Sequence, residues 1–197
     1  MAEHVPGGYF GRALVVDVTD GSTRVLPLPE QVLRQHVGGV GLGAWLLHEL
    51  APAGVDPLGT EAPLAFVFSP LVGTPLTTSA KFAVVAKSPL TGLLTDALAS
   101  SHFAISGKLT GHDAIVLVGR AERPSVVRVE GRTVVVEDAG TSWGRTAAGT
   151  GSTPGATAGR CGSSCPGIRR SNRPRSRERS RSPGSSPSAR SWSPTPG

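Results

Sequence analysis

Two lysines at the ends of a short hydrophobic segment are the residues of this sequence best suited to binding an anion. Lys81 and Lys87 begin and end KFAVVAK, which predicts a β-strand that leads into the turn KSPLTG. At roughly 3.3 Å per residue they lie about 20 Å apart, so they cannot bind the same small anion. Pro89 keeps Ser88 out of helical geometry and Gly92 suits a turn, so the residues alone favour a structural corner over a ligand-binding loop.

A glycine-rich segment, GGVGLGAW at residues 38–45, could in principle approach a dinucleotide phosphate. The strict G-x-G-x-x-G pattern is absent, and only the looser form that ends in alanine is present. The segment also follows a predicted helix rather than a strand, which is the wrong context for that site. We interpret it as a flexible joint with close backbone packing, or as an anion site at the N-terminus of the helix that contains Trp45.

The histidines and cysteines do not form a metal-ligand pattern. No H-E-x-x-H occurs, and Cys161 and Cys165 lack the further ligands that a zinc or iron–sulfur site needs. His102 is the histidine to consider for function, because it follows the KSPLTG turn. Both cysteines lie beyond residue 150, so we expect no disulfide in the folded part, which fits a cytoplasmic protein.

The composition changes sharply near residue 150. Residues 151–197 contain nine arginines and one acid, so they carry +8 of charge and the first 150 residues carry −2 of the chain's +6. Because this tail has few apolar residues to offset the entropy cost of ordering, we expect it to be disordered. Its charge could bind nucleic acid. Its composition also suggests a GC-rich gene read out of frame, and we hypothesise that the tail is such a product.

Apolar patterns predict the elements that must position these residues. Residues 10–28 predict a β-hairpin around an Asp-Gly turn, and Pro29 opens a helix that stops at Gly38. A second helix is predicted over residues 42–50. Further strands are predicted at 63–69, 81–87, 113–119, 124–130 and 132–138, the last two as a hairpin around Gly131.

Most of these strands are linked by hairpins rather than separated by helices. This favours a largely antiparallel, β-rich α+β fold with two or three short helices, and argues against a doubly wound sheet. We assign residues 1–149 to one folded domain, large enough for a core, and residues 150–197 to the disordered tail. No signal peptide is visible, and the longest apolar run, residues 63–72, is about half a membrane span, so we expect no membrane association.

The order and spacing of several motifs resemble the N-terminal domain of the aldehyde:ferredoxin oxidoreductase family, tungsten or molybdenum enzymes that carry a pterin. The resemblance runs from Gly8 to Gly144, and its most specific parts are VDPL, KSPLTG and GHDAIVLVGRAERP. It implies a β-rich base of two sheets that carries a metal bis-pterin cofactor together with magnesium.

The resemblance also implies which residues bind that cofactor. Lys81 occupies the position of an arginine that contacts the pterin phosphates, and lysine lacks the planar two-pronged donor, so we expect a looser hold. Residues 98–101 stand where the family has Asn-x-Gly-Gly beside the pterins and magnesium. Leu98 offers only its backbone carbonyl there, whereas Ser100 can donate through its backbone and hydroxyl. We predict Lys81, Leu98 and Ser100 as cofactor-binding residues, and no catalytic or metal-ligating residue.

By the same resemblance, the complete enzyme oxidises an aldehyde or related carbonyl compound and passes electrons through a [4Fe–4S] cluster to ferredoxin. The cluster's cysteines and the acid–base residues belong to a later portion that this sequence does not contain, so we expect a truncated chain that is inactive alone. Two alternatives stay open: a non-enzymatic module whose basic tail binds nucleic acid, and an accessory subunit completed by another polypeptide. A homodimer is also left open.

Overall fold

The computed structural model of the chain describes residues 5–130, 133–140 and 143–144. The chain divides into two compact units, residues 1–167 and 168–197, and every described residue lies in the first unit. The predicted tail, its two cysteines and the turn at Gly131 lie outside the described residues. The domain boundary at residue 149 therefore stays a prediction.

Eight strands and three helices are present among the described residues. In chain order they are β1 (Arg12–Asp17), β2 (Thr23–Pro27), α1 (Glu30–His36), α2 (Gly39–Leu50), β3 (Leu64–Phe68), β4 (Lys81–Lys87), β5 (Leu94–Ser100), α3 (His102–Leu109), β6 (Ala114–Val118), β7 (Ser125–Glu130) and β8 (Thr133–Asp138). The expected fold class, a β-rich α+β domain with two sheets and short helices, is confirmed. No described helix is long and apolar enough to cross a bilayer.

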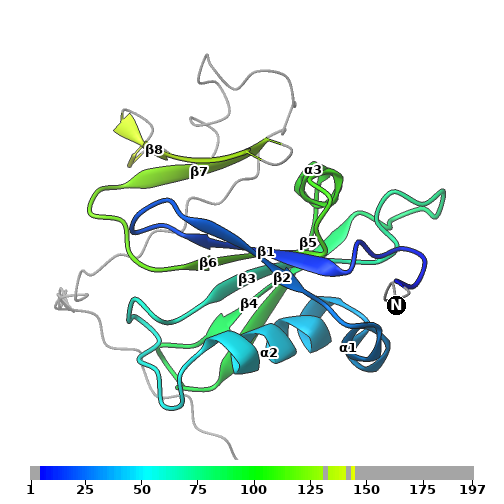
Figure 1. Cartoon of the computed structure of the whole chain (residues 1–197), viewed down its shortest axis with the longest axis horizontal. Coiled ribbons are helices and arrows are strands. Elements are labelled where there is room, and N and C mark those ends of the chain that lie inside the picture. Colours follow the sequence, from blue (N-terminus) through cyan, green and yellow to red (C-terminus); the bar gives the residue numbers. More distant parts are fainter. Residues whose placement is uncertain (1–4, 131–132, 141–142, 145–197) are drawn as a thin grey trace, which may run out of the picture. The chain divides into compact units, whose positions relative to one another are not determined.

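Six strands form one sheet in the order β2-β1-β6-β3-β4-β5, and β7 and β8 pair with each other (Figure 1). All neighbours are antiparallel, as expected, except β1 and β6, which are parallel. Ala13 pairs with Ala114 in that ladder, so the middle of the sheet joins an early segment of the chain to a late one. β4 has a partner on each side, as its apolar sequence predicts.

Helices α1 and α2 cover one face of the sheet, whereas α3 and the β7–β8 pair lie on the other (Figure 1). Strand β1 contributes to both cores, because Ala13 and Val15 are buried under the first two helices and Leu14 and Val16 are buried on the α3 side. A strand covered on both faces requires a continuous apolar run, and ALVV supplies it.

Most of the glycine-rich segment is helical. The chain turns at Val37 and Gly38, and α2 begins at Gly39, earlier than the predicted start at Leu42. A Cβ atom at Gly43 would overlap the side chain of Val85 on β4, so this glycine allows α2 to pack directly on the sheet. The structure favours close backbone packing over a dinucleotide site for this segment.

Strand β5 and helix α3 are the two elements among the described residues that the sequence patterns above do not predict. All seven residues of β5, LTDALAS, are exposed. Neither of its faces is buried in a core, so its sequence does not need the alternation of apolar and polar residues that identifies a half-buried strand. It is a strand because each of its residues pairs with a residue of β4 across the turn at residues 88–93.

Candidate functional site

The predicted cofactor residues meet on one face of the β4–β5 ladder. Lys81 pairs with Ser100, and Ala83 pairs with Leu98. Directly opposed residues of antiparallel strands project to the same face, and alternate residues of one strand share a face. Lys81, Leu98 and Ser100 therefore project from the same face, at the end of the sheet where β4 begins.

This face is open at the Lys81 end. Lys81 is exposed, and Leu98 is 71% exposed. Among the described residues, no side chain forms an ion pair with the Lys81 ammonium group. A free ammonium group beside a serine hydroxyl on the next strand is a suitable pair of donors for a phosphate monoester.

Asp96 shares this face and limits where an anion can bind. It pairs with Val85, two positions along β5 from Leu98, and is exposed. Its carboxylate disfavours an anion at that end of the strand, so the position beside Lys81 and Ser100 is the more favourable one for a phosphate. The Leu98 side chain lacks any polar atom, so only its backbone could contact a polar group of a cofactor.

The other end of β4 forms the structural corner that the residues predict. The Lys87 ammonium group donates to the carbonyl oxygen of Val55 at 2.6 Å. The Ser88 hydroxyl accepts from the backbone N–H groups of Leu90 and Thr91, which stabilises the turn. Gly92 takes the positive φ of 71° that this turn requires. Lys87 and Ser88 thus connect the strands and are not placed to contact a ligand at Lys81.

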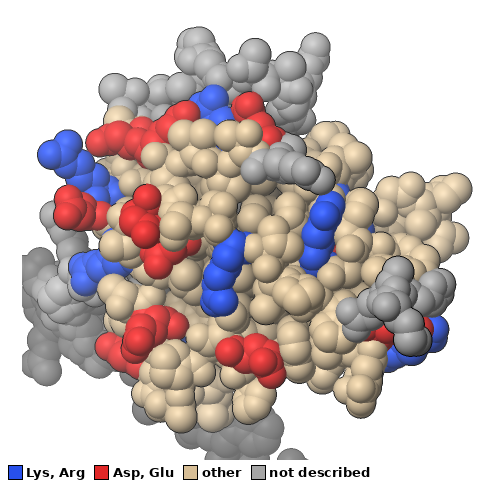
Figure 2. Space-filling model, in the orientation of Figure 1, with Lys and Arg blue, Asp and Glu red and all other residues tan. Residues whose placement is uncertain are grey.

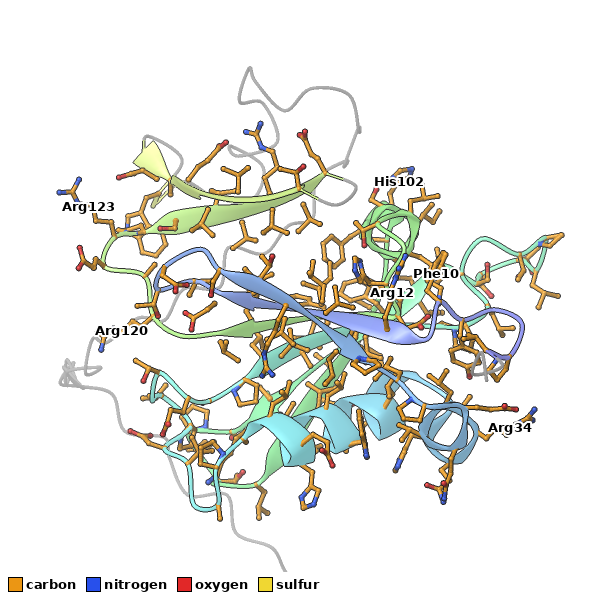
Figure 3. The ribbon with its side chains drawn as sticks, viewed as in Figure 1. Phe10, Arg12, Arg34, His102, Arg120 and Arg123 are labelled. Atoms are coloured by element: carbon orange, nitrogen blue, oxygen red, sulfur yellow. The ribbon has the colours of Figure 1, made fainter. Side chains whose placement is uncertain are left out.

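The histidine that follows β5 is placed on the surface of α3. Ser101 caps this helix by accepting from the N–H of Phe103 at 3.1 Å. His102 Nδ1 lies 3.2 Å from Ser106 Oγ, one helical turn ahead. Its side chain points outward, away from Phe10 and Arg12 (Figure 3). Within the described residues, His102 therefore has no partner that would make it a general acid or base at the predicted site.

A buried ion pair lies on the same side of the sheet as α3. Lys108 Nζ donates to Asp113 Oδ1 at 2.6 Å, and Asp113 is 0% exposed. The same carboxylate accepts from the backbone N–H groups of Phe10, at 2.9 Å, and Gly11, at 2.7 Å. The Lys108 ammonium group also lies 5.7 Å from the ring centre of Tyr9. Asp113 therefore ties the loop before β1 to α3 and β6.

Sequence reasoning missed this pair, although GHDAIV was among the most specific motifs. The available signal is an acidic residue directly before the fully apolar strand β6, a position that becomes buried when the strand is central. A buried carboxylate requires several donors, and its partners are spread over the chain, so residue types alone could not identify them.

An open pocket of about 340 Å³ lies against this ion pair, lined by residues 8–10 and 72–73 with Ile105, Lys108 and Leu109. The lining is mostly apolar, and Lys108, its charged group, is already bound to Asp113. Burial, and secondarily the charge of Asp113, raises the pKa of Tyr9, so its hydroxyl stays neutral and donates to the carbonyl oxygen of Val37. The described residues thus provide no reactive group in this pocket.

His112, next to Asp113, makes stability depend on pH. Burial, and then the positive charge of Arg12, lowers the pKa of His112 below its ordinary value of 6.5. The unfolded chain therefore binds a proton more readily than the folded one, and the free energy of unfolding falls as the pH drops below about 6.5.

We expect His112→Gln to reduce this loss of stability at low pH, measured as the change in urea midpoint between pH 7.5 and 5.5. Equal changes in both proteins would contradict the assignment.

The face shown in Figure 2 has no extended patch of one charge sign. On the face in Figure 2, acidic and basic side chains are interspersed among uncharged residues. No group of three or more His, Cys, Asp or Glu in the described ranges is arranged to hold a metal ion.

Comparison with known proteins relates this domain to a family of redox enzymes. The family model described as aldehyde ferredoxin oxidoreductase, N-terminal domain, matches residues 13–162. The chain is 34% identical over 146 residues to the tungsten-containing aldehyde ferredoxin oxidoreductase of Pyrococcus furiosus, which covers 74% of this chain and 24% of that protein. It is also 34% identical over 139 residues to an aliphatic sulfonate oxidoreductase, WOR-like subunit, of the same organism. That match covers 69% of this chain and 22% of the relative.

One solved structure is also similar to this chain. The active site complex BamBC of benzoyl coenzyme A reductase, in complex with 1,5-dienoyl-CoA, superposes with a TM-score of 0.63 and 28% identity. The match covers 67% of this chain and 20% of that one. The chain spans about a quarter of the length of the curated relatives it matches.

Proposed function

Because the chain belongs to the aldehyde ferredoxin oxidoreductase family, as its N-terminal domain, we propose that it forms the cofactor-binding base of a tungsten-pterin oxidoreductase. The complete enzyme would oxidise an aldehyde or related carbonyl compound and transfer electrons to ferredoxin. A [4Fe–4S] cluster, magnesium and the acid–base residues are part of this proposal, and other segments of a family-length enzyme would supply the cluster ligands. This chain alone would therefore lack oxidoreductase activity.

The proposed cofactor-binding role rests on the position of three residues in the β4–β5 ladder. The ladder places Lys81 and Ser100 side by side on an exposed face, and Leu98 lies one pair further along. We assign the Lys81 ammonium group to a pterin phosphate, the Ser100 hydroxyl to the same phosphate and the Leu98 carbonyl to a neighbouring polar group. When bound, the metal would supply the redox chemistry, and these residues would only anchor and orient its organic ligand.

The test is the pterin content of the chain after production in a host that makes the cofactor, measured by fluorescence after oxidative release. We expect Lys81→Ala to weaken pterin binding roughly 10- to 100-fold, because a charge-assisted hydrogen bond contributes about 1.5–3 kcal/mol. Lys81→Arg should retain or raise the pterin content, because guanidinium binds phosphate through two parallel donors.

Lys87→Met is the matched control, since it removes a positive charge from the opposite end of the same strand. It should lower stability through loss of the bond to Val55 while leaving the pterin content per folded chain unchanged. Equal pterin content in Lys81→Ala and the parent chain would refute the assignment of Lys81. A chain that never binds pterin would refute the proposed function of the isolated domain.

A further inference from the structure

The pocket beside the ion pair of Lys108 and Asp113 is large enough for a small ligand. Its volume of about 340 Å³ falls in the range of small-molecule sites, and a cavity of roughly half that size can hold a benzene ring. Three segments of this domain supply its walls, namely the loop before β1, the loop after β3 and helix α3. The pocket therefore does not depend on a second chain for any of these residues.

The pocket lies on the opposite side of the sheet from the predicted cofactor residues. Lys81 shares its face of β4 with Ala83 and Val85, which are buried in the core under α1 and α2. Val72 and Ile105 of the pocket instead belong to the core on the α3 side. A ligand in this pocket would therefore not contact Lys81, and the inference does not rest on the proposed function.

Lys108 provides the pocket with hydrogen-bond donors that the protein does not use. Its side chain is 9% exposed, and the residue lines the pocket. An ammonium group has three N–H bonds, and among the described residues only Asp113 accepts from this one. The ring centres of Tyr9 and Phe10 lie 5.7 and 5.5 Å from the nitrogen, so the rings attract its charge but offer no strong acceptor. Because a buried donor without an acceptor is costly, an acceptor atom on a ligand would be stabilising there.

The charges beside the pocket favour a neutral ligand. Asp113 already compensates the charge of Lys108, and its carboxylate also accepts from the backbone N–H groups of Phe10 and Gly11. A bound carboxylate would lie close to Asp113 without a cation of its own. A bound ammonium group would lie beside Lys108 without a carboxylate of its own. In either case the pocket would bury an unpaired charge, which is strongly unfavourable.

The walls of the pocket favour a flat aromatic body for the ligand. The two aromatic rings can pack edge to face or offset against a further ring, which adds to the gain from apolar burial. A Cβ atom at Gly73 would meet no other atom within 4 Å, so this wall leaves room for a ring. The apolar side chains that line the pocket are those of Tyr9, Phe10, Val72, Ile105 and Leu109.

We propose that this pocket is a binding site for a small neutral aromatic molecule that carries an acceptor oxygen, such as an aromatic ester or ketone. The ring packs against Tyr9 and Phe10, and the oxygen accepts from the Lys108 ammonium group without displacing Asp113. Since the described residues place no reactive group in the pocket, the ligand binds there without being converted. Methyl benzoate has the required ring and acceptor and serves as the probe.

The test is a titration of the full 197-residue chain with methyl benzoate, followed through the amide chemical shifts in nuclear magnetic resonance spectra. We expect a dissociation constant of about 0.1–1 mM, a modest affinity for a ligand of about ten non-hydrogen atoms. The shifts should change at residues 8–10, 73 and 105 and stay constant along β5. Benzoate should bind about tenfold more weakly or worse, because it buries a charge. Methyl cyclohexanecarboxylate should bind about threefold more weakly, because it lacks the aromatic ring.

Ile105→Trp should weaken the binding of methyl benzoate about tenfold or more, because the indole ring would occupy the pocket and leave the ion pair in place. Leu90→Trp is the matched control, since Leu90 is 92% exposed in the turn after β4 and does not line the pocket, and it should leave the affinity unchanged. Lys108→Met combined with Asp113→Asn removes the donor without leaving a buried charge unpaired, and should weaken binding about tenfold. Absence of saturable binding, equal affinity for methyl benzoate and benzoate, or unchanged binding in Ile105→Trp would each overturn the proposal.

Discussion

Replacement of Asp113 by alanine is expected to lower the free energy of unfolding by about 3–5 kcal/mol, because it leaves the buried ammonium group of Lys108 without a partner. The carboxylate accepts from Lys108 at 2.6 Å and from two consecutive backbone N–H groups of the loop before β1. Without it, the Lys108 ammonium group, whose side chain is 9% exposed, has lost its ion-pair partner inside the protein. The loss should appear as a lower urea midpoint by circular dichroism.

The double variant Asp113→Ala with Lys108→Met separates two contributions to the lost stability. One is the cost of leaving the Lys108 charge unpaired, and the other is the loss of the hydrogen bonds from the loop before β1. Methionine fills much of the lysine volume without a charge, so the double variant should recover part of the stability lost in Asp113→Ala. The backbone N–H groups of Phe10 and Gly11 would still lack their acceptor, so recovery should be incomplete. A double variant that is less stable than Asp113→Ala would contradict this explanation.

Phe68→Ala should destabilise the domain by about 3–5 kcal/mol, the range for removing a buried aromatic ring. Phe68 is 1% exposed and its ring packs against Phe103 of α3, with centroids 6.0 Å apart. The ring also occupies the space that a side chain at Gly107 would need. Its removal leaves a cavity between the sheet and α3, and the unfolding midpoint should fall accordingly.

Phe68→Leu is the graded comparison, because it retains most of the apolar volume and should cost clearly less than the alanine variant. Gly107→Ala provides a complementary test, since the added methyl group would overlap the Phe68 ring. In the Phe68→Leu background the same methyl group should cost less, because the smaller side chain leaves room. If the effects of the two substitutions on the free energy of unfolding were additive, the overlap between the Phe68 ring and the methyl group at position 107 would not be the cause of the destabilisation.

Local patterns predicted the parts of the fold that depend on neighbouring residues. The hairpin of β1 and β2 follows from a β-branched run and its Asp-Gly turn, where Gly21 has a φ of 75°. The parallel pairing of β1 with β6 could not be predicted in this way, because it depends on packing between segments that are far apart in the chain. Strand β5 escaped prediction for a different reason, since both of its faces are exposed.

The candidate site shows a similar division. The turn at residues 88–93 sets the register that brings Ser100 beside Lys81, and the sequence indicates that turn through Pro89 and Gly92. The assignment of Lys81, Leu98 and Ser100 to a cofactor came from family resemblance and stays a prediction. The buried carboxylate of Asp113 was missed, because two of its donors, the N–H groups of Phe10 and Gly11, lie 103 and 102 residues away in the chain and only folding brings them close.

The parallel ladder between β1 and β6 has a consequence for synthesis on the ribosome. β1 leaves the exit tunnel early, but the strand that covers its inner edge is encoded roughly 100 residues later, which takes about 5–20 s at ordinary translation rates. During that interval the nascent hairpin of β1 and β2 has an uncovered apolar edge, which is a target for chaperones and for neighbouring nascent chains.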